Sequence, residues 1–429
     1  MVAKAKSNKA KGGSSCGFDF GTSNSSLATL VGNQPRLIAL QDGKTAVPTA
    51  VFFNFDNGQT YFGRQAISSY LDYDEGRLLR SLKSLLGSSL FDESTYVRSR
   101  RVEFAEIIEL FVAFGRAATA TSASAGATHV VMGRPVHFVD DDTAADAMAE
   151  AQLHAAALKA GFEHVEFQFE PIAAALDYEQ SVRAEEIALV IDIGGGTSDF
   201  SVVRVSPERA LAANRKDDIL SCTGVHIGGT DFDRLLSLKT LMPFLGFKSR
   251  MLKGNMNPPS WYYHDLSTWQ RINVLYDGKV ITDITRVRHE SAEPDKLTRL
   301  LKVLELKQGH ELLGQVEETK IQLSSATEVG LASVAFDRGQ KLKVTRRQFE
   351  AAVHDAMLRV GAKITETVTL AGLKGPDIST VFLTGGSSGI PMLRGLISKA
   401  LPTAKIIEGD AFGSVATGLA IEAHRRFGR

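Results

Sequence analysis

Two glycine-rich segments of the sequence each place an aspartate inside an apolar run, directly before a turn. The first reads FDFGTS over residues 18–23 and contains Asp19, and the second reads IDIGGGTS over residues 191–198 and contains Asp192. Glycine turns let backbone N–H groups converge on an anion without interference from a Cβ. An aspartate beside such a turn can hold Mg²⁺ through the waters that this ion retains. Each segment therefore predicts a phosphate-binding hairpin with a carboxylate for a metal.

The two segments supply one set of expected phosphate contacts, which are Gly21, Thr22, Ser23 and Asn24 in the first segment and Gly194, Gly195, Gly196 and Thr197 in the second. The hairpins lie in different halves of the chain, so we expect two related lobes that hold one nucleotide between them. Asp19 and Asp192 would bind Mg²⁺ through water. No GxxxxGK[ST] motif occurs, which excludes a P-loop enzyme.

Strand and helix signals alternate around the hairpins, and this alternation predicts an α/β protein. An apolar, β-branched run at 187–193 predicts the buried strand before the second turn. The other expected elements are a helix at 143–161 ending at Gly161, a helix starting at Pro171, a strand at 380–386, and helices at 390–401 and 416–427.

The chain is expected to contain two lobes and two additional regions. We place a disordered tail at 1–16, a first lobe at 17–189, a second lobe at 190–429, and an inserted helical subdomain at about 231–316 within the second lobe. The insertion contains the aromatic residues Trp261, Tyr262, Tyr263 and Trp269. These rings could form a platform for a ligand, but a core for the small subdomain is the interpretation we favour.

The composition argues against several classes of function. Lys and Arg number 49, as do Asp and Glu, so the balanced charge gives no support for nucleic-acid binding. Two cysteines cannot form a disulfide framework. No apolar run is long enough to span a membrane, and the basic start lacks the apolar region of a secretory signal. We therefore expect a cytoplasmic protein without nucleic-acid or membrane partners.

Seven segments, in order, resemble the nucleotide-binding domain of the seventy-kilodalton heat-shock chaperones over residues 17–427. They read GFDFGTSNSSLATL (17–30), RSLKSLLG (80–87), FEPIAAALDY (169–178), VIDIGGGTSDFSVV (190–203), VHIGGTDFDRLL (225–236), EETKIQLSS (317–325) and FLTGGSSGIPMLRGLI (382–397). The resemblance implies an actin-like ATPase (ribonuclease H-like) fold, with two lobes around a central cleft for ATP or ADP and Mg²⁺. Within the family, GDAFGSVATGLA (409–420) resembles the YegD-like chaperones.

The resemblance also implies roles for individual residues in slow ATP hydrolysis. The implied catalytic residues are Lys83, Glu170, Asp192 and Thr197, with Lys83 stabilising charge on the γ-phosphate and Glu170 orienting water. Without the resemblance, Lys83 would be interpreted as a solvated helix lysine, and Asp199 is interpreted as structural. The further implied nucleotide contacts are Gly228, Gly229, Glu317, Lys320, Ser324, Gly385, Gly386 and Ser387.

Two positions depart from the family pattern, in which two arginines bracket the adenine. This sequence has Ile321 and Gly389 in their places, so we expect adenine to be bound with lower affinity. The family's β-sandwich peptide-binding domain has no counterpart before Arg429. We therefore expect a nucleotide-dependent switch that acts on a separate protein client or co-chaperone.

Three alternative functions remain open at this point. An ATP-dependent small-molecule kinase of the same superfamily would need an aspartate base facing a polar substrate, and no segment stands out as one. An actin-like filament protein would pellet with ATP. A degenerate ATPase would bind nucleotide without turnover, and the retained Asp19, Lys83, Glu170, Asp192 and Thr197 argue against it.

Overall fold

The computed structural model describes residues 14–428, except 33, 73, 121–125, 140–141, 180–181, 213–214, 254–255, 333–335, 337–340 and 411–412. Most of the tail expected at 1–16 therefore lies outside the described residues. Its last residues do not form a tail, because the first strand, β1 (Ser15–Phe20), begins there and Cys16 is fully buried. Cys16 is held in register with Val130 of a neighbouring parallel strand, which places it in the core.

The first lobe contains a mixed sheet, smaller sheets and the helices that cover them. Its strands are β1, β2 (Asn24–Val31), β3 (Gln34–Leu37), β4 (Ala46–Pro48), β5 (Ala50–Asn54), β6 (Thr60–Phe62), β7 (Gly76–Arg80), β8 (Ser94–Val97), β9 (Arg100–Glu103), β10 (His129–Arg134) and β11 (His164–Phe169). Its helices are α1 (Gly63–Leu71), α2 (Phe104–Thr119), α3 (Thr143–Lys159) and α4 (Glu170–Glu179), with 3₁₀ turns η1 (Leu82–Leu85) and η2 (Ser89–Asp92). The main sheet has the order β11-β10-β1-β2-β3, and β5 lies between β6 and β7 in a separate sheet.

The second lobe repeats the strand–turn–strand arrangement of the first. Its elements are β12 (Glu186–Ile193), β13 (Ser198–Val205), η3 (Arg209–Leu211), η4 (Lys216–Asp218), β14 (Ile219–Val225), α10 (Arg346–Leu370), η6 (Gly375–Asp377), β17 (Thr380–Thr384), α11 (Pro391–Ala400) and β18 (Lys405–Glu408). The sheet order is β14-β13-β12-β17-β18. The lobe boundary expected between residues 189 and 190 falls inside β12, because a strand pairs along its whole length and joins one sheet as a unit.

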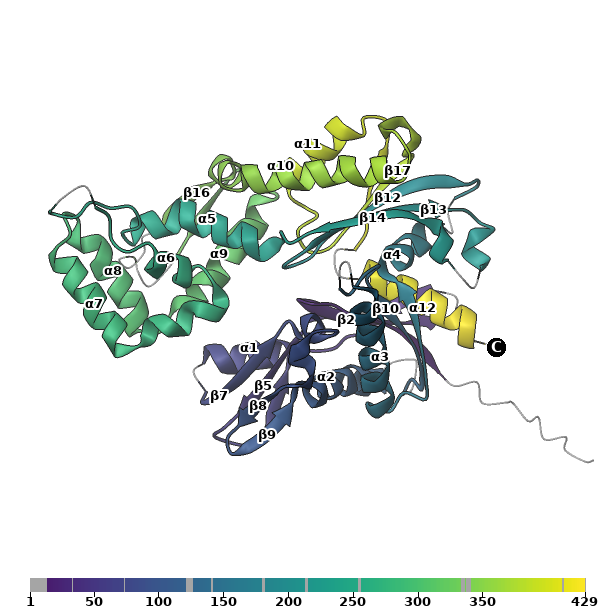
Figure 1. Ribbon diagram of the computed structural model, residues 1–429, viewed down its shortest axis with the longest axis horizontal. Coiled ribbons are helices and arrows are strands. Elements are labelled where there is room, and N and C mark those ends of the chain that lie inside the picture. Colours follow the sequence, from purple (N-terminus) through teal and green to yellow (C-terminus); the bar gives the residue numbers. More distant parts are fainter. Residues whose placement is uncertain are drawn as a thin grey trace, which may run out of the picture.

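A helical body extends from the second lobe, on the same side as α1 and β7 of the first lobe (Figure 1). Its elements are α5 (Gly229–Phe244), α6 (Trp261–Leu266), η5 (Trp269–Tyr276), α7 (Gly278–His289), α8 (Pro294–Glu305), α9 (Gly309–Leu323), β15 (Glu328–Leu331) and β16 (Leu342–Thr345). Tyr262 and Tyr263 are fully buried in its core, whereas Trp261 is 40% exposed. No helix among the described residues has the length and apolar character needed to cross a membrane.

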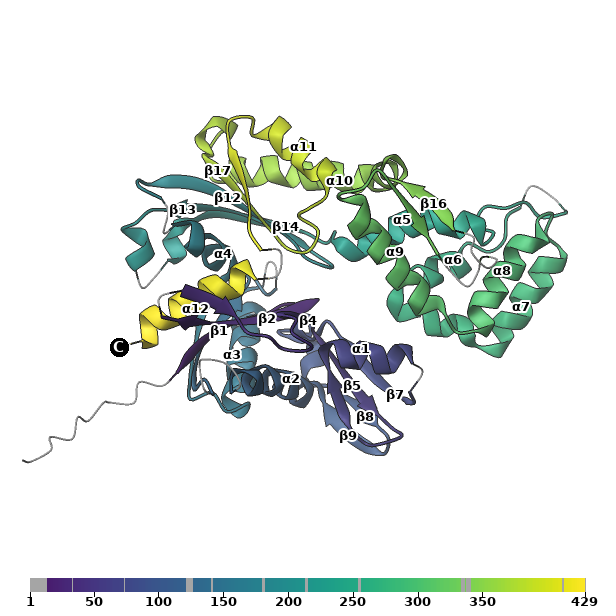
Figure 2. The same ribbon diagram turned by 180° about the vertical axis from the view of Figure 1, so that it is seen from behind.

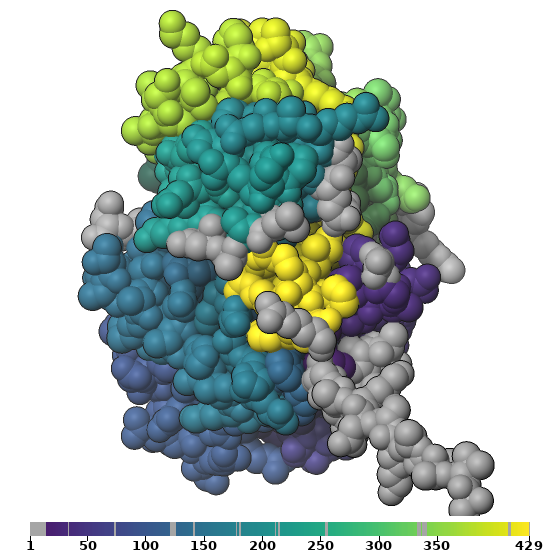
Figure 3. Space-filling view, turned by 90° about the vertical axis from the view of Figure 1, so that its right-hand side faces the viewer, coloured from purple at the N-terminus to yellow at the C-terminus, as the bar shows by residue number. Residues whose placement is uncertain are grey.

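The last helix, α12 (Ser414–Phe427), returns from the second lobe to the first, although residues up to 429 were expected in the second lobe. It packs on β1 and α4 so closely that a Cβ on Gly17 would overlap the backbone at Leu419 and Ala420. Figure 2 shows α12 between the two main sheets, and Figure 3 shows it at the surface where the lobes meet. The predicted α/β class is confirmed by two sheets with helices around them.

Candidate functional site

The turns of the two glycine hairpins meet where the lobes face each other. The first turn joins β1 to β2, and the second joins β12 to β13. A Cβ built on Gly195 would overlap the side chain of Ser23, so a larger residue here would force Ser23 to move. The two sets of expected phosphate contacts, predicted from different halves of the chain, therefore lie together in space.

The first hairpin is held in shape by Thr49, which the sequence analysis did not single out. Thr49 Oγ1 donates a hydrogen bond to the carbonyl of Gly21 at 2.7 Å, and its backbone N–H donates to the carbonyl of Ser23 at 2.9 Å. These bonds fix the backbone around Thr22. Thr49 follows β4 in a segment without a recognisable motif, so no local signal could have identified it.

The second hairpin is closed by a hydrogen bond from Gly194 N–H to the Thr197 carbonyl at 2.9 Å. The start of α5 lies directly against it, because Gly229 N–H donates to the Gly194 carbonyl at 2.9 Å. A Cβ on Gly228 would overlap the backbone of Gly195. The start of a helix carries partial positive charge, so this arrangement places a favourable dipole beside the expected phosphate contacts.

Lys83 and Glu170 form an ion pair beside the hairpins, with Nζ 2.5 Å from Oε1. Lys83 comes from η1, and Glu170 is the first residue of α4. The side chains are only 10% and 16% exposed. Burial by itself lowers the pKa of Lys83, but the carboxylates of Glu170 and Asp19 more than offset it and raise the pKa above its usual value. Lys83 is therefore a firmly charged ammonium.

The two hairpin aspartates have strongly raised pKa values. Burial and then the Glu170 carboxylate raise the pKa of Asp19 to about 7, although Lys83 opposes them. Burial, followed by the charge of Asp199, raises the pKa of Asp192 to about 8. Glu170 thus opposes ionisation of both hairpin aspartates, and at neutral pH Asp19 is partly protonated and Asp192 mostly protonated.

A magnesium ion fits this donor set, because it prefers oxygen ligands and a divalent charge would relieve the repulsion between the carboxylates. Asp19 and Asp192 are the residues that would hold it. Within the described ranges, no group of three or more His, Cys, Asp or Glu side chains could bind a metal directly. That the two aspartates act through metal-bound water stays a prediction.

The hydroxyl of Thr197 points toward the same charged group. Its Oγ1 donates to Asp199 Oδ2 at 3.2 Å. Asp199 was interpreted as structural, but its charge also raises the pKa values of Asp192 and Lys83. Asp199 therefore belongs electrostatically to the site. Its position two residues after Thr197 is the feature of the sequence that could have indicated this role.

A second part of the site brings together three of the expected nucleotide contacts. The buried Lys320 Nζ donates to the Gly229 carbonyl at 3.2 Å and to Asp233 Oδ2 at 2.9 Å. A Cβ on Gly229 would lie 2.8 Å from Ser387 Oγ. Burial raises the pKa of Asp233 to about 6, against the opposing charge of Lys320. Gly229, Lys320 and Ser387 thus meet beside the second hairpin.

The remaining expected adenosine contacts come from α9 and from the turn that follows β17. Gly385 has a left-handed φ of 83°, and a Cβ there would overlap Asp192. Ser324 ends α9, and its carbonyl accepts from Arg346 Nη2 at 3.2 Å. Gly386 is exposed. Glu317 acts electrostatically on Asp233 and on Arg80 of the first lobe.

The two positions that depart from the family pattern are open to solvent. Ile321 is 51% exposed, and a Cβ on Gly389 would have no neighbouring atom within 4 Å. The structure therefore has room for larger side chains at both positions.

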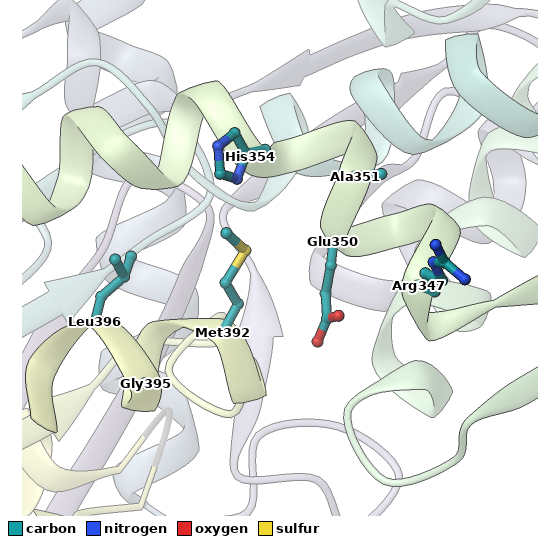
Figure 4. A pocket seen from close by; sticks show the side chains of 7 residues that line it. All are labelled: Arg347, Glu350, Ala351, His354, Met392, Gly395 and Leu396. Atoms are coloured by element: carbon teal, nitrogen blue, oxygen red, sulfur yellow. The ribbon is translucent and has the colours of Figure 1, made fainter. Parts of the chain in front are cut away.

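A pocket of about 510 Å³ lies elsewhere, between α10 and α11 (Figure 4). Its lining consists of Arg347, Glu350, Ala351, His354, Met392, Gly395 and Leu396. It contains none of the expected nucleotide contacts, so it is separate from the candidate site.

Comparison with known proteins gives a match to the family model described as Hsp70 protein, over residues 114–244 and 299–428. The chain is 25% identical over 423 residues to the stromal 70 kDa heat shock-related protein, chloroplastic, of Pisum sativum, covering 95% of this chain and 52% of that protein. It is 24% identical over 430 residues to the chaperone protein dnaK of Gracilaria tenuistipitata var. liui, covering 95% and 59%.

These matches extend along almost the whole chain, and the chain spans about half the length of the curated relatives it matches. The name of the Pisum sativum relative places that protein in the chloroplast stroma. The cytoplasmic location expected for this chain stays a prediction.

Proposed function

Because this chain belongs to the Hsp70 family and has its actin-like ATPase fold, we propose that it binds ATP between its lobes and hydrolyses it slowly with Mg²⁺. The observation that carries the proposal is the meeting of the Ser23 and Gly195 turns beside the Lys83–Glu170 pair. One polyphosphate placed there would contact both hairpins and the ammonium at once.

Lys83 would stabilise negative charge on the transferred phosphoryl group. Phosphoryl transfer requires positioning and charge stabilisation rather than covalent chemistry from the protein. An ammonium that is already charged and nearly buried can do this without reorganisation, which is where electrostatic catalysis is most effective. Bound Mg²⁺, held through water by Asp19 and Asp192, would supply further neutralisation of the phosphate oxygens.

Glu170 would orient the attacking water. Its Oε1 accepts from Lys83, and this bond fixes the carboxylate beside the hairpin turns. Thr197 and Thr22 would donate from their hydroxyls to the terminal phosphate. Thr197 Oγ1 would then exchange its bond to Asp199 for one to the nucleotide.

ATP would act as a conformational signal because its contacts come from both lobes. Binding energy shared between the Ser23 and Gly195 turns favours the arrangement in which the lobes are close. We propose that a protein client or co-chaperone reads this arrangement. ADP, which lacks the terminal phosphate, would hold the lobes together less firmly.

Titration calorimetry with ATP and ADP in Mg²⁺, followed by a phosphate-release assay, tests the proposal. We expect saturable binding of one nucleotide per chain and slow release of phosphate that requires Mg²⁺. Failure to bind either nucleotide would refute the proposal. Formation of ADP and a phosphorylated small-molecule acceptor, without release of free phosphate, would instead favour the kinase. ATP-dependent pelleting would favour the filament protein.

A further inference from the structure

A second set of contacts joins the lobes, away from the two hairpin turns. Tyr70, near the end of α1 in the first lobe, meets residues of η5 and α9 in the helical body. Its ring centroid is 6.3 Å from that of Trp269 and 4.9 Å from that of His310. Asn273 Nδ2 donates to the Tyr70 hydroxyl at 2.7 Å. The helical body therefore touches the first lobe directly.

Arg80 takes part in this contact from the neighbouring strand. It is the last residue of β7, and its guanidinium carbon lies 4.7 Å from the centre of the Trp269 ring. The side chain of Arg80 stays exposed on one side, while partial desolvation lowers its pKa and the carboxylate of Glu317 opposes that shift. Arg80 therefore faces an aromatic ring and a negative charge that both belong to the opposite lobe.

The position of Arg80 in the chain connects this contact to the candidate catalytic lysine. Arg80 is paired with Ala50 at the end of the β5–β7 ladder. Ser81 follows in a left-handed conformation with φ of 57°, and η1 with Lys83 begins immediately after it. A junction this short leaves little freedom between the two side chains, so a shift of Arg80 moves Lys83.

We propose that Arg80 is a positioning residue for ATP hydrolysis, and that it places Lys83 correctly only when the first lobe touches Trp269. The proposal rests on the ATPase function proposed above. Glu317 is also an expected adenosine contact, so this residue links the nucleoside end of the site to the phosphate end. Closure of the lobes would therefore also bring Lys83 into its correct position.

The substitutions Arg80→Ala, Arg80→Lys and Arg77→Ala test the proposal. Arg77 lies on the same strand and is exposed, which makes it a matched control. Since a cation–π contact and one charge contact are removed, we expect single-turnover hydrolysis by Arg80→Ala to fall by about 5- to 30-fold. The dissociation constant for ATP should change less than the rate, Arg80→Lys should recover part of the rate, and Arg77→Ala should match the unaltered protein.

A fluorescence measurement gives a readout that does not depend on hydrolysis. The chain contains two tryptophans, so Trp261→Phe leaves Trp269 as the reporter. In this background, Arg80→Ala should shift the emission of Trp269 in the free protein, because the guanidinium leaves its ring.

The possible outcomes separate this proposal from the one on which it rests. An Arg80→Ala variant that hydrolyses ATP at the unaltered rate, or loses rate and affinity in equal proportion, overturns the positioning role alone. Unchanged Trp269 emission shows that the contact does not form and also overturns it. Absence of hydrolysis in the unaltered protein overturns both proposals.

Discussion

Lys83 and Glu170 lie 87 positions apart in the chain, yet their side chains form a nearly buried ion pair of 2.5 Å. The lysine comes from a 3₁₀ turn of the first lobe and the glutamate from the start of α4. Each fixes the position of the other, so neither has to be ordered when substrate arrives. Such preorganisation is what electrostatic catalysis requires.

Replacing Lys83 with alanine should abolish most of the hydrolysis while nucleotide binding is retained. Loss of one preorganised charge contact costs on the order of 10²–10³ in rate. Single-turnover hydrolysis and titration calorimetry measure the two effects separately. Lys159, which is 67% exposed and lies 3.8 Å from Glu109, is a suitable control for alanine substitution. Unaltered hydrolysis by Lys83→Ala would remove the lysine from the mechanism.

Binding of Mg²⁺ and nucleotide should release protons near pH 7 to 8. The pKa values of Asp19 and Asp192 are raised to about 7 and about 8, and a nearby divalent cation favours their ionised forms. Calorimetry in buffers of different ionisation enthalpy measures the number of protons. The Asp192→Asn variant should release fewer, and equal release by both proteins would contradict the assignment.

The raised pKa of Asp192 also predicts how the stability of the protein changes with pH. The folded pKa of Asp192 lies above its ordinary value of 3.8, so the folded protein binds this proton more tightly than the unfolded chain. Its contribution to stability is greatest at low pH and is lost as the pH rises toward 8. Thermal unfolding should show Asp192→Asn gaining stability over the unaltered protein between pH 5 and pH 8. A constant difference across that range would argue against the raised pKa.

The close approach of the lobes at Gly195 predicts the effect of adding one methyl group. A Cβ there would overlap Ser23, whereas a Cβ on Gly196 would have no neighbour within 4 Å. Gly195→Ala should therefore destabilise the free protein by about 1–3 kcal/mol, the usual cost of overpacking, and Gly196→Ala should leave its stability unchanged. Denaturant unfolding measures both.

A second substitution tests the cause of that loss. Ser23→Gly removes the side chain that the new methyl group would strike, so the double variant should recover part of the lost stability. No recovery would mean that Gly195 is needed for another reason.

The base end of the site should bind adenine weakly. Two family arginines are replaced by Ile321 and Gly389, and cation–π contacts contribute about 0.5–2 kcal/mol each. Without them, the dissociation constant for ATP should be roughly 5- to 1000-fold higher. Introducing Ile321→Arg and Gly389→Arg together should tighten ATP more than inorganic triphosphate, as measured by calorimetry. Nanomolar binding by the unaltered protein, or no gain in the double variant, would refute this view of the pocket.

Local signals in the sequence predicted individual elements well. The apolar run at 187–193 is found as β12, which begins one residue earlier. The helix predicted to end at Gly161 is α3, and Gly161 has a φ of 101°, which explains why the chain leaves the helix there. These elements depend on residues close together in the chain, so the sequence pattern was sufficient.

Contacts between distant segments were not predictable in the same way. The core of the helical body includes Tyr262 and Tyr263 as expected, but Trp269 lies against Tyr70 of the other lobe. The sequence predicted no role for Arg80, because Trp269 and Glu317, which act on it from the opposite lobe, are far away in the chain. The motifs predicted candidate residues for the site, whereas their arrangement depends on packing between the lobes.

The return of α12 to the first lobe has a consequence for synthesis of the protein. Gly17 is among the first described residues, and its neighbours Leu419 and Ala420 belong to the last helix. While a ribosome makes the intervening chain, β1 and β2 lack the helix that packs on them in the folded protein, because α12 does not yet exist. Chains emerge at about 5–20 residues per second, so the apolar surface that α12 covers stays open for roughly 20–80 seconds. A protein of a chaperone family would thus itself need this apolar surface to be shielded from aggregation during its synthesis.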